Sequence, residues 1–366
     1  MSVLILARDF DPSVDAMIPA LTERDAHVYR VNTAWFPTQM QLMAQLNGRW
    51  HGRLITPRGP VELEELTAVW YRSPEAYAMP HQLSPGEAQH ALVEAKYGLG
   101  GMLGSLPVLW CNHPNRVADA AYKPVQLARA SIAELMVPDT LITNDADTAH
   151  EFTLGGPTVT KLVGGMTVEE DGVRRNVYTR LLSEADLADL RGIEHTAHLF
   201  QRWVPKAREC RVIVIGEHLT AAAITAVSEG AHVDYRTGCN SLSYELIDPP
   251  TEVAAGIRAL MDSFGLVYGA LDFVLTPDTG RPGARAPGQL RSASTPRHPR
   301  RRHGLARTRP LRPDHRHLLN SPATASGATH WPSSRSPSSA CSRCSPSTRR
   351  HSNSHATHRQ SASPSR

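Results

Sequence analysis

The feature that most constrains this chain is a change of composition at Gly280, after which most of the residue types that build a folded core disappear. The 86 residues from Arg281 to Arg366 hold 17 Arg, 17 Ser and 11 Pro, but no Val, Ile, Met, Phe or Tyr. Such a segment cannot bury enough apolar surface to offset the entropy of its chain. We therefore predict a folded body up to Gly280 and a disordered tail after it.

Charge follows the same division. The tail has no Lys, no Glu and one Asp, so its net charge is +16, and the body carries −12. A segment with so many arginines can bind nucleic acid by releasing counterions, and a functional arm of this kind is one interpretation of the tail. Its only aromatic residue is Trp331. Stacking platforms for bases need more, so nucleic acid is not the partner that we expect.

The body reads as a cytoplasmic protein. Ser2 leads directly into an apolar strand without a basic leader, and the apolar stretch from Gly98 to Trp110 is too short to span a membrane. The odd number of widely spaced cysteines in the body suits reduced thiols better than a disulfide framework. In the tail, Cys341 and Cys344 lack the second ligand pair that a zinc site needs.

The order of elements indicates an α/β fold. A strand, a helix and a strand follow one another within residues 3–31, which predicts a parallel layer. We expect further helices over Ser84–Gly104, with Ser84 and Glu87 as a capping box, over Arg116–Glu134 and over Thr251–Phe264. A basic hairpin is expected at 173–182. The first domain lacks a glycine-rich phosphate fingerprint, so it is not interpreted as a dinucleotide binder.

Two of the four lysines of the chain stand where they could meet phosphates. Lys161 ends an apolar strand beside Gly164-Gly165, a pair that could close as a loop over a nucleotide. The alternative is a lysine at a strand end that extends to water. Lys123, in the preceding helix, raises the same question.

Two charged residues stand within apolar strands. Arg211 precedes an apolar run, and it either faces a cleft or pairs with Glu209 on the same strand face. Asp272 lies within the run from Tyr268 to Leu275. A buried carboxylate needs a partner or a metal, so Asp272 is either a hydrogen-bonded core residue or a ligand of a hard cation such as Mg²⁺.

In this order the residues resemble the ATP-grasp fold, and in particular the ATP-grasp ribosomal peptide maturases (graspetide synthetases, microviridin-type ligases). The resemblance extends from Met1 to about Gly280. It is carried by short segments in a specific order, which are Ala68–Pro74, Cys111–Arg116 with Lys123, Val137–Thr140, Val159–Leu162, and Phe200–Val204 through Glu209–Val212.

The resemblance implies a pre-ATP-grasp α/β domain (1–115) and a two-lobed ATP-grasp domain. The latter comprises a central subdomain (116–195) and an incomplete C-terminal subdomain (196–280), followed by the tail (281–366). It also assigns roles. Lys123 and Lys161 would contact ATP, Lys161 on the phosphates. The hinge of Gln201, Trp203 and Val204 would contact adenine, and Glu209 would contact the ribose or the hinge side. Arg211 would face the γ-phosphate and the acyl phosphate, and Arg236, in Asp234-Tyr235-Arg236, the substrate. Asp272 would bind Mg²⁺.

The implied reaction joins a carboxylate to an alcohol or amine at the expense of ATP. Asp or Glu side chains of a ribosomal precursor peptide, with leader and core, would become acyl phosphates and then ester or amide crosslinks. A homodimer is compatible with the resemblance. The alternatives are an amino-acid ligase of the glutamate-adding type and a non-catalytic pseudo-enzyme that binds a leader peptide.

The pattern breaks after Asp272. The family places a Glu-x-Asn metal motif on the next strand, but here the turn at 276–280 leads into a tail without any Glu, and we expect no such strand. The missing motif predicts weak binding of Mg·ATP and impaired activity. A tail rich in Arg, Pro, Ser, Ala and His but without Lys is typical of an out-of-frame translation of a GC-rich gene. We therefore predict a frameshift near the Gly280 codon, which resequencing would test.

Overall fold

The computed structural model describes residues 1–164, 167–170, 173–226, 242–276, 284–285 and 290–291. The chain divides into two compact units, Met1–Thr329 and His330–Arg366, and the second lies outside the described residues. The prediction of a disordered tail therefore falls almost entirely outside them. No helix in these ranges is long and apolar enough to cross a membrane.

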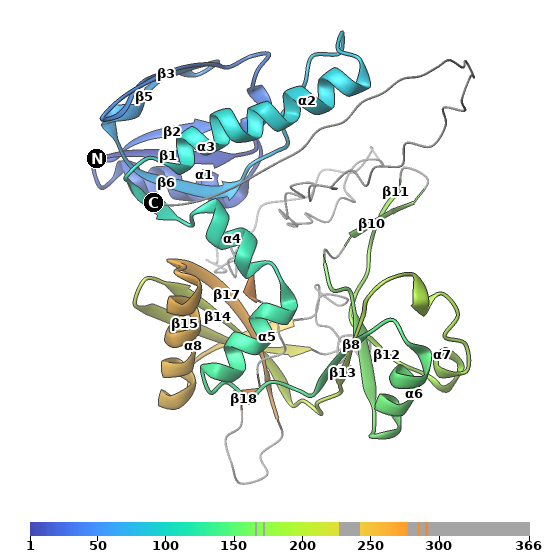
Figure 1. The fold of residues 1–366 in the computed structure, drawn as a ribbon. Coiled ribbons are helices and arrows are strands. Elements are labelled where there is room, and N and C mark those ends of the chain that lie inside the picture. Colours follow the sequence, from blue (N-terminus) through green and yellow to red (C-terminus); the bar gives the residue numbers. More distant parts are fainter. Residues whose placement is uncertain (165–166, 171–172, 227–241, 277–283, 286–289, 292–366) are drawn as a thin grey trace, which may run out of the picture. The chain divides into compact units, whose positions relative to one another are not determined.

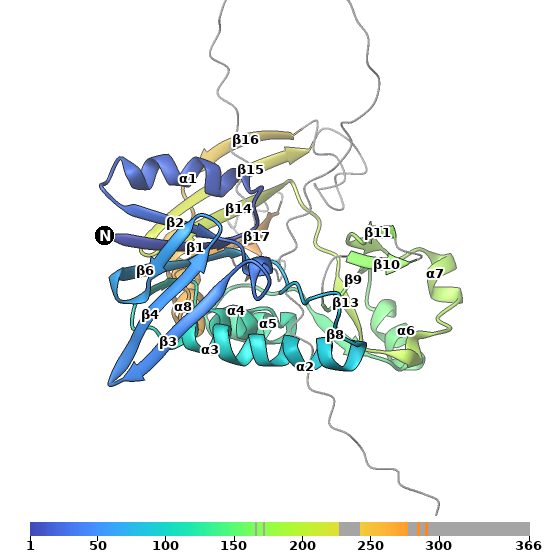
Figure 2. The ribbon, with the colours of Figure 1, turned by 90° about the horizontal axis from the view of Figure 1, so that it is seen from above.

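The N-terminal part is built on a parallel sheet with helices on both faces (Figure 1). The sheet has the order β2-β1-β6-β7, with the bounds β1 Ser2–Ala7, β2 His27–Val31, β6 Leu66–Ser73 and β7 Leu109–Cys111. Figure 2 shows α1 (Pro12–Thr22) on one face and the continuous run of α2 (Pro85–Ala95), the π-turn η3 (Lys96–Gly100) and α3 (Gly101–Gly104) on the other. The predicted strand–helix–strand unit is confirmed.

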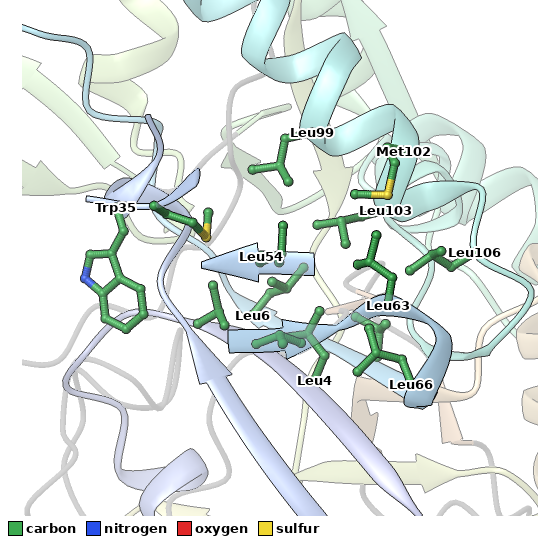
Figure 3. Close-up of a cluster of buried hydrophobic side chains, with 14 of the residues drawn as sticks. Leu4, Leu6, Trp35, Leu54, Leu63, Leu66, Leu99, Met102, Leu103 and Leu106 are labelled. Carbon is green, nitrogen blue, oxygen red and sulfur yellow. The ribbon is translucent and has the colours of Figure 1, made fainter. Parts of the chain in front are cut away.

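Alternation along the strands explains this two-sided burial. Val3 and Ile5 pack against α1, whereas Leu4 and Leu6 face the α3 side. Figure 3 shows the second cluster, in which Leu4, Leu6 and Leu54 meet Leu99 and Leu103. The capping box also forms, because the Ser84 side chain accepts from the Glu87 N–H while Glu87 accepts from the Ser84 N–H.

A small antiparallel sheet completes this core. Its strands are β3 (Gln41–Asn47), β4 (Arg49–Thr56) and β5 (Gly59–Glu62), and the 3-10 turns η1 (Thr33–Trp35) and η2 (Leu63–Glu65) flank it. The turn between β3 and β4 is the single residue Gly48, whose φ of 71° suits glycine.

The helix expected over Arg116–Glu134 is wrong in one respect, because it is two helices. α4 (Pro114–Ala120) ends before Ala121-Tyr122, and α5 (Lys123–Ile132) begins at the next residue. Pro124 explains the break, since proline lacks the N–H that an uninterrupted helix would use but fits the first turn of a new one.

The central part has the sheet order β12-β9-β13-β8 and carries a separate hairpin. Its elements are β8 Thr140–Thr143, α6 Ala146–Leu154, β9 Thr158–Lys161, β10 Thr167–Glu170, β11 Val173–Asn176, β12 Arg180–Leu181, α7 Glu184–Ala188, η4 Ile193–His195 and β13 His198–Arg202. The hairpin expected at 173–182 is wrong in position, because the observed hairpin begins earlier in the chain. It joins β10 to β11, whereas β12 pairs with β9.

The third part is an antiparallel sheet with the order β16-β15-β14-β17. Its elements are β14 Arg208–Ile215, β15 His218–Ala226, β16 Leu242–Ile247, α8 Thr251–Phe264 and β17 Tyr268–Leu275. One face packs on α8, α4 and α5 through Val212, Ile257, Leu260, Leu271 and Phe273. The opposite face carries Glu209, Arg211 and Asp272.

The expectation that no strand follows the turn after β17 is wrong. Two short strands, β18 (Ala284–Arg285) and β19 (Leu290–Arg291), pair antiparallel with β17. These two strands lie along the edge of β17, but neither contains the Glu or Asn of the family motif, as the sequence predicts.

Candidate functional site

Arg211 and Asp272 form an ion pair across β14 and β17. They stand opposite each other in the register, and both side chains point away from the helix-covered core. Arg211 Nε donates to Asp272 Oδ1 at 2.8 Å and Nη2 donates to Oδ2 at 3.0 Å. Asp272 is 6% exposed, and the Arg211 side chain is 22% exposed. The cation within an apolar strand is thus explained by a buried carboxylate on the neighbouring strand.

The two predicted nucleotide lysines lie close to one stretch of chain. Lys123 is the buried first residue of α5, and its Nζ donates to the carbonyls of Leu162 and Gly164, the latter at 3.2 Å. Lys161 ends β9, and its Nζ donates to Gln201 Oε1 at 2.8 Å. The structure therefore brings together Lys123, Lys161 and Gln201 around the segment that leads into the glycine pair. Gly165 itself lies outside the described residues.

Gln201 fixes the orientation of Lys161. Its side chain is 3% exposed, and its Nε2 donates to Thr140 Oγ1 at 2.8 Å. The amide is thereby held in one orientation, with its oxygen toward the lysine. A buried neutral acceptor thereby positions the ammonium.

The segment after β13 contains a further cation that the sequence did not single out. The side chain of Lys206 is 7% exposed, its Nζ forms a close ion pair with Glu209, and it lies 5.7 Å from the centroid of the Trp203 ring. Trp203 and Glu209 are thus joined through Lys206, and Val204 is buried beside them. The available signal was the scarcity of lysine, since Lys206 is one of only four in the chain.

Tyr268 and Arg72 were also missed. Arg72 lies at the end of β6, where it is 3.5 Å from Asp11 and its Nη2 donates to Ser13 Oγ at 3.2 Å. Burial lowers the pKa of Arg72, and Asp11 and Tyr268 oppose that shift. Burial raises the pKa of Tyr268, whereas Arg72 and Arg211 lower it. Tyr268 is therefore within electrostatic reach of Arg72 on the N-terminal sheet and of Arg211 on the third sheet.

Asn112 joins the end of β7 to the start of β17. Its Oδ1 accepts from the backbone N–H groups of Val267 and Tyr268 at 2.7 and 2.9 Å, and its Nδ2 donates to the Tyr268 carbonyl at 2.7 Å. The side chain is 1% exposed. Three buried hydrogen bonds from one amide fix the strand that carries Asp272 against the parallel sheet.

The residues do not make a complete metal site. Within the described ranges no group of three or more His, Cys, Asp or Glu side chains could hold an ion. Asp272 is the one carboxylate of β17, and both of its oxygens accept hydrogen bonds from Arg211. Mg²⁺ prefers one or two carboxylates together with substrate phosphates. The fit to Mg²⁺ is therefore poor.

The predicted site residues fall into two groups in the structure. Lys123, Lys161 and Gln201 are linked by the contacts around β9 and β13, whereas Glu209, Arg211 and Asp272 share one face of the third sheet. Trp203 and Val204 lie between them in the chain. Arg236, with Asp234 and Tyr235, lies outside the described residues.

Comparisons with known proteins bear on the fold and the family. Residues 2–118 match the family model for the MvdD pre-ATP grasp domain. The fold is similar to macrocyclase MdnC bound with precursor peptide MdnA from Microcystis aeruginosa MRC, at 25% identity and a TM-score of 0.70, covering 81% of this chain and 92% of that one. None of the curated proteins matches the chain.

Two further solved structures are similar over a comparable share of the chain. A Chryseobacterium gregarium RiPP-associated ATP-grasp ligase in complex with ADP and a leader and core peptide is 26% identical, with a TM-score of 0.72, and the match covers 80% of this chain and 90% of that one. Macrocyclase MdnB from Microcystis aeruginosa MRC is 25% identical, with a TM-score of 0.65 and coverage of 80% and 92%. The expected α/β architecture with a pre-ATP-grasp domain is confirmed.

Proposed function

We propose that this chain is an ATP-grasp ligase of the graspetide-maturase type, which activates Asp or Glu side chains of a ribosomal precursor peptide and joins them to hydroxyl or amine side chains. The observation that carries the proposal is the convergence of Lys123, Lys161 and Gln201 at the end of β9. We also propose the division into domains at 1–115, 116–195 and 196–280, and a location in the cytoplasm, where ATP is available.

The nucleotide is assigned to the two lysines. A triphosphate needs cations that keep their charge, and Lys161 is oriented by the neutral amide of Gln201. Lys123 belongs to the same stretch through its bonds to Leu162 and Gly164. Trp203, Val204 and the Lys206–Glu209 pair lie in the segment proposed for adenine and ribose. The roles of these residues, like that of Arg236, are part of the proposal.

The chemistry follows from the weakness of a carboxylate as an acyl donor, because its leaving group would be an oxide. Transfer of the γ-phosphoryl group of ATP to a carboxylate oxygen gives an acyl phosphate and ADP. A Ser or Thr hydroxyl or a Lys amine then attacks the acyl carbon, loses its proton, and releases phosphate. Arg211 would stabilise the negative charge that develops on the phosphoryl oxygens, which requires that its bonds to Asp272 open.

Magnesium belongs to the chemistry of this family, but among the residues that the structure describes the proposal has one ligand for it, Asp272. Because that carboxylate is bonded to Arg211, no step is assigned to the metal. The same observation favours a second candidate, a pseudo-enzyme that binds a peptide without turning it over. An amino-acid ligase of the glutamate-adding type is the third.

The test is incubation of the full chain with the precursor peptide encoded beside its gene, ATP and Mg²⁺, followed by mass spectrometry. Loss of one water mass per link supports the proposal, and a gain in mass indicates residue addition instead. An unchanged mass with retained peptide binding would favour the pseudo-enzyme. Lys161→Ala should abolish the mass loss, whereas Lys96→Ala, which alters a lysine of the π-turn η3, should not.

A homodimer is compatible with the proposal and can be tested separately. Sedimentation of the purified chain at several concentrations gives its mass in solution. A single species of about 40 kDa would rule out a stable dimer, given a chain mass of 40.1 kDa.

A further inference from the structure

The register of the third sheet places Arg211 between one charged neighbour and one small neighbour. On β17 it stands opposite Asp272, and on β15 it stands opposite Ala222, which is followed in the same row by Leu246 of β16. Residues that pair directly across a sheet share a face, so these four side chains form one row. Asp272 is the member of the row that can bind the guanidinium.

The two partners of this ion pair are buried to different depths. The side chain of Asp272 is 6% exposed, whereas that of Arg211 is 22% exposed. Both oxygens of Asp272 accept hydrogen bonds from Arg211, one from Nε and one from Nη2. Solvent and ligands therefore reach the guanidinium more readily than the carboxylate beneath it.

This arrangement does not suit a ligand of Mg²⁺. A carboxylate that binds the ion directs an oxygen at it, usually together with the oxygens of other ligands. Both oxygens of Asp272 face Arg211 instead, and a guanidinium at that distance would repel a second cation. Among the residues with described positions, no three His, Cys, Asp or Glu side chains form a metal site around it.

The donors that Asp272 occupies are the ones that a phosphate would use. The planar fork of an arginine binds two oxygens of a carboxylate or two oxygens of a phosphate in the same way. A phosphate that takes Nε and Nη2 of Arg211 must therefore displace Asp272. The carboxylate then stays buried without its cation, and this cost is subtracted from the affinity for the phosphate.

We propose that Asp272 is an internal counter-anion of Arg211, which a phosphate group of the nucleotide must displace, and that this chain binds the nucleotide without Mg²⁺. The inference rests on the proposed function for the identity of the anion as ATP. It gives Asp272 the opposite effect to that of a metal ligand, since the carboxylate weakens nucleotide binding instead of strengthening it.

The test measures binding alone, because the two roles of Asp272 predict opposite effects of one substitution. The full chain is titrated into the fluorescent nucleotide trinitrophenyl-ATP, once with EDTA and once with Mg²⁺. Asp272→Asn keeps the size of the side chain and removes its charge. The matched control is Glu245→Gln, because Glu245 pairs with Arg208 of the same strand β14 at 2.6 Å but its side chain is 68% exposed. Thermal unfolding of each variant checks that it is folded.

In EDTA we expect Asp272→Asn to bind the nucleotide about tenfold more tightly than the wild type, the size of one charge-assisted hydrogen bond that no longer has to be broken. Glu245→Gln should bind as the wild type does. Mg²⁺ should change the affinity of the wild type by less than about twofold, which is a small fraction of the free energy of binding.

Equal or weaker binding by Asp272→Asn, tighter binding by the wild type when Mg²⁺ is added, or no binding by either protein would overturn the inference. If Asp272→Asn does not fold, the comparison of the wild type in EDTA and in Mg²⁺ decides alone. Tighter binding by Asp272→Asn without any crosslinked peptide would leave the inference standing and remove only the proposed function. Crosslinking by a wild type whose nucleotide binding depends on Mg²⁺ would do the reverse.

Discussion

At the scale of single residues, Arg211 and Asp272 depend on each other for neutralisation. Asp272→Ala leaves a guanidinium among apolar strands, so we expect the free energy of unfolding to fall by about 3 kcal/mol. Arg211→Met combined with Asp272→Leu should recover much of this loss, because no charge then remains buried. Urea unfolding of the two single variants and the double variant measures the coupling.

The control for this cycle is the exposed pair of Arg191 and Asp189, which are in ion-pair contact at 2.5 Å on the surface. Asp189→Ala should leave the unfolding curve unchanged within error, because exposed pairs contribute little. If Asp272→Ala behaved in the same way, the buried pair would have no structural role.

Cys210 gives a prediction about pH. Burial, with a contribution from Asp272, raises the pKa of its thiol to about 11. An unfolded thiol loses its proton near pH 8.5 or so, whereas the folded one keeps it, so deprotonation favours the unfolded chain. This contribution to stability is complete below about pH 8.5 and should fall by about 2 kcal/mol as the pH approaches 11.

The measurement is urea unfolding at pH 7.5, 9 and 10.5 for the wild type and Cys210→Ala. The variant starts from a lower stability because it loses buried volume, but its stability should decline less steeply with pH. Identical slopes would mean that the thiol ionises equally well in the folded chain. Iodoacetamide at pH 8 should also react slowly with folded Cys210.

At the scale of elements, the contact of α8 with the end of α5 depends on Gly256. A Cβ there would lie 2.6 Å from the Ala133 carbonyl oxygen and 2.8 Å from Leu135 Cδ2. Because a backbone atom cannot move aside easily, Gly256→Ala should lower the free energy of unfolding by about 1–3 kcal/mol. Gly98→Ala is the matched control, since nothing lies within 4 Å of its Cβ. It should be neutral or stabilise by about 0.5–1 kcal/mol. Destabilisation by both variants to the same extent would contradict the packing argument.

The helices and strands also show which sequence signals are sufficient to predict an element and its bounds. The strand at 2–7, the capped helix after Ser84 and the pair β14–β15 follow from local periodicity and capping. The break after Ala120 required a choice between two places for Pro124, inside one helix or at the start of another. The hairpin of β10 and β11 was displaced because the charged residues of 167–176 give little alternation, so its register depends on tertiary contacts.

At the scale of the whole molecule, the pairing of β18 and β19 predicts where the folded chain can be shortened. Ending it after Arg291 keeps the edge of β17 covered, whereas ending it after Gly280 exposes backbone groups next to Asp272. We expect the variant 1–280 to be less stable than 1–291 by about 2 kcal/mol, the net value of a few hydrogen bonds. Equal unfolding midpoints would show that these strands contribute nothing.

The residues after Arg291 give a separate prediction. Full-length chain should be retained on a heparin column up to a higher salt concentration than 1–291, because the positive charge of the tail binds polyanions by counterion release. The unfolding midpoints of the two should agree. Resequencing across the Gly280 codon then decides between a basic arm and the proposed frameshift, which would place a Glu-x-Asn strand in another reading frame.

The candidate site was predictable in its types of residue rather than in its connections. A lysine at a strand end, an arginine before an apolar run and an aspartate within one are visible as exceptions in the sequence. Their partners are not, because Lys161 meets Gln201 and Arg211 meets Asp272 across 40 and 61 residues of chain. Tyr268 carried no signal of its own, since its place beside Arg72 and Arg211 arises from the fold.

The amide of Asn112 has an evolutionary consequence. Each of its bonds to β17 reaches a backbone atom, so the strand can change its side chains without losing the junction, whereas position 112 cannot change freely. Aspartate at 112 would keep the acceptor and lose the donor. Relatives should therefore differ at 267 while they retain an asparagine at 112. The side chains of β17 can then change to suit new substrates without disturbing how the two sheets are joined.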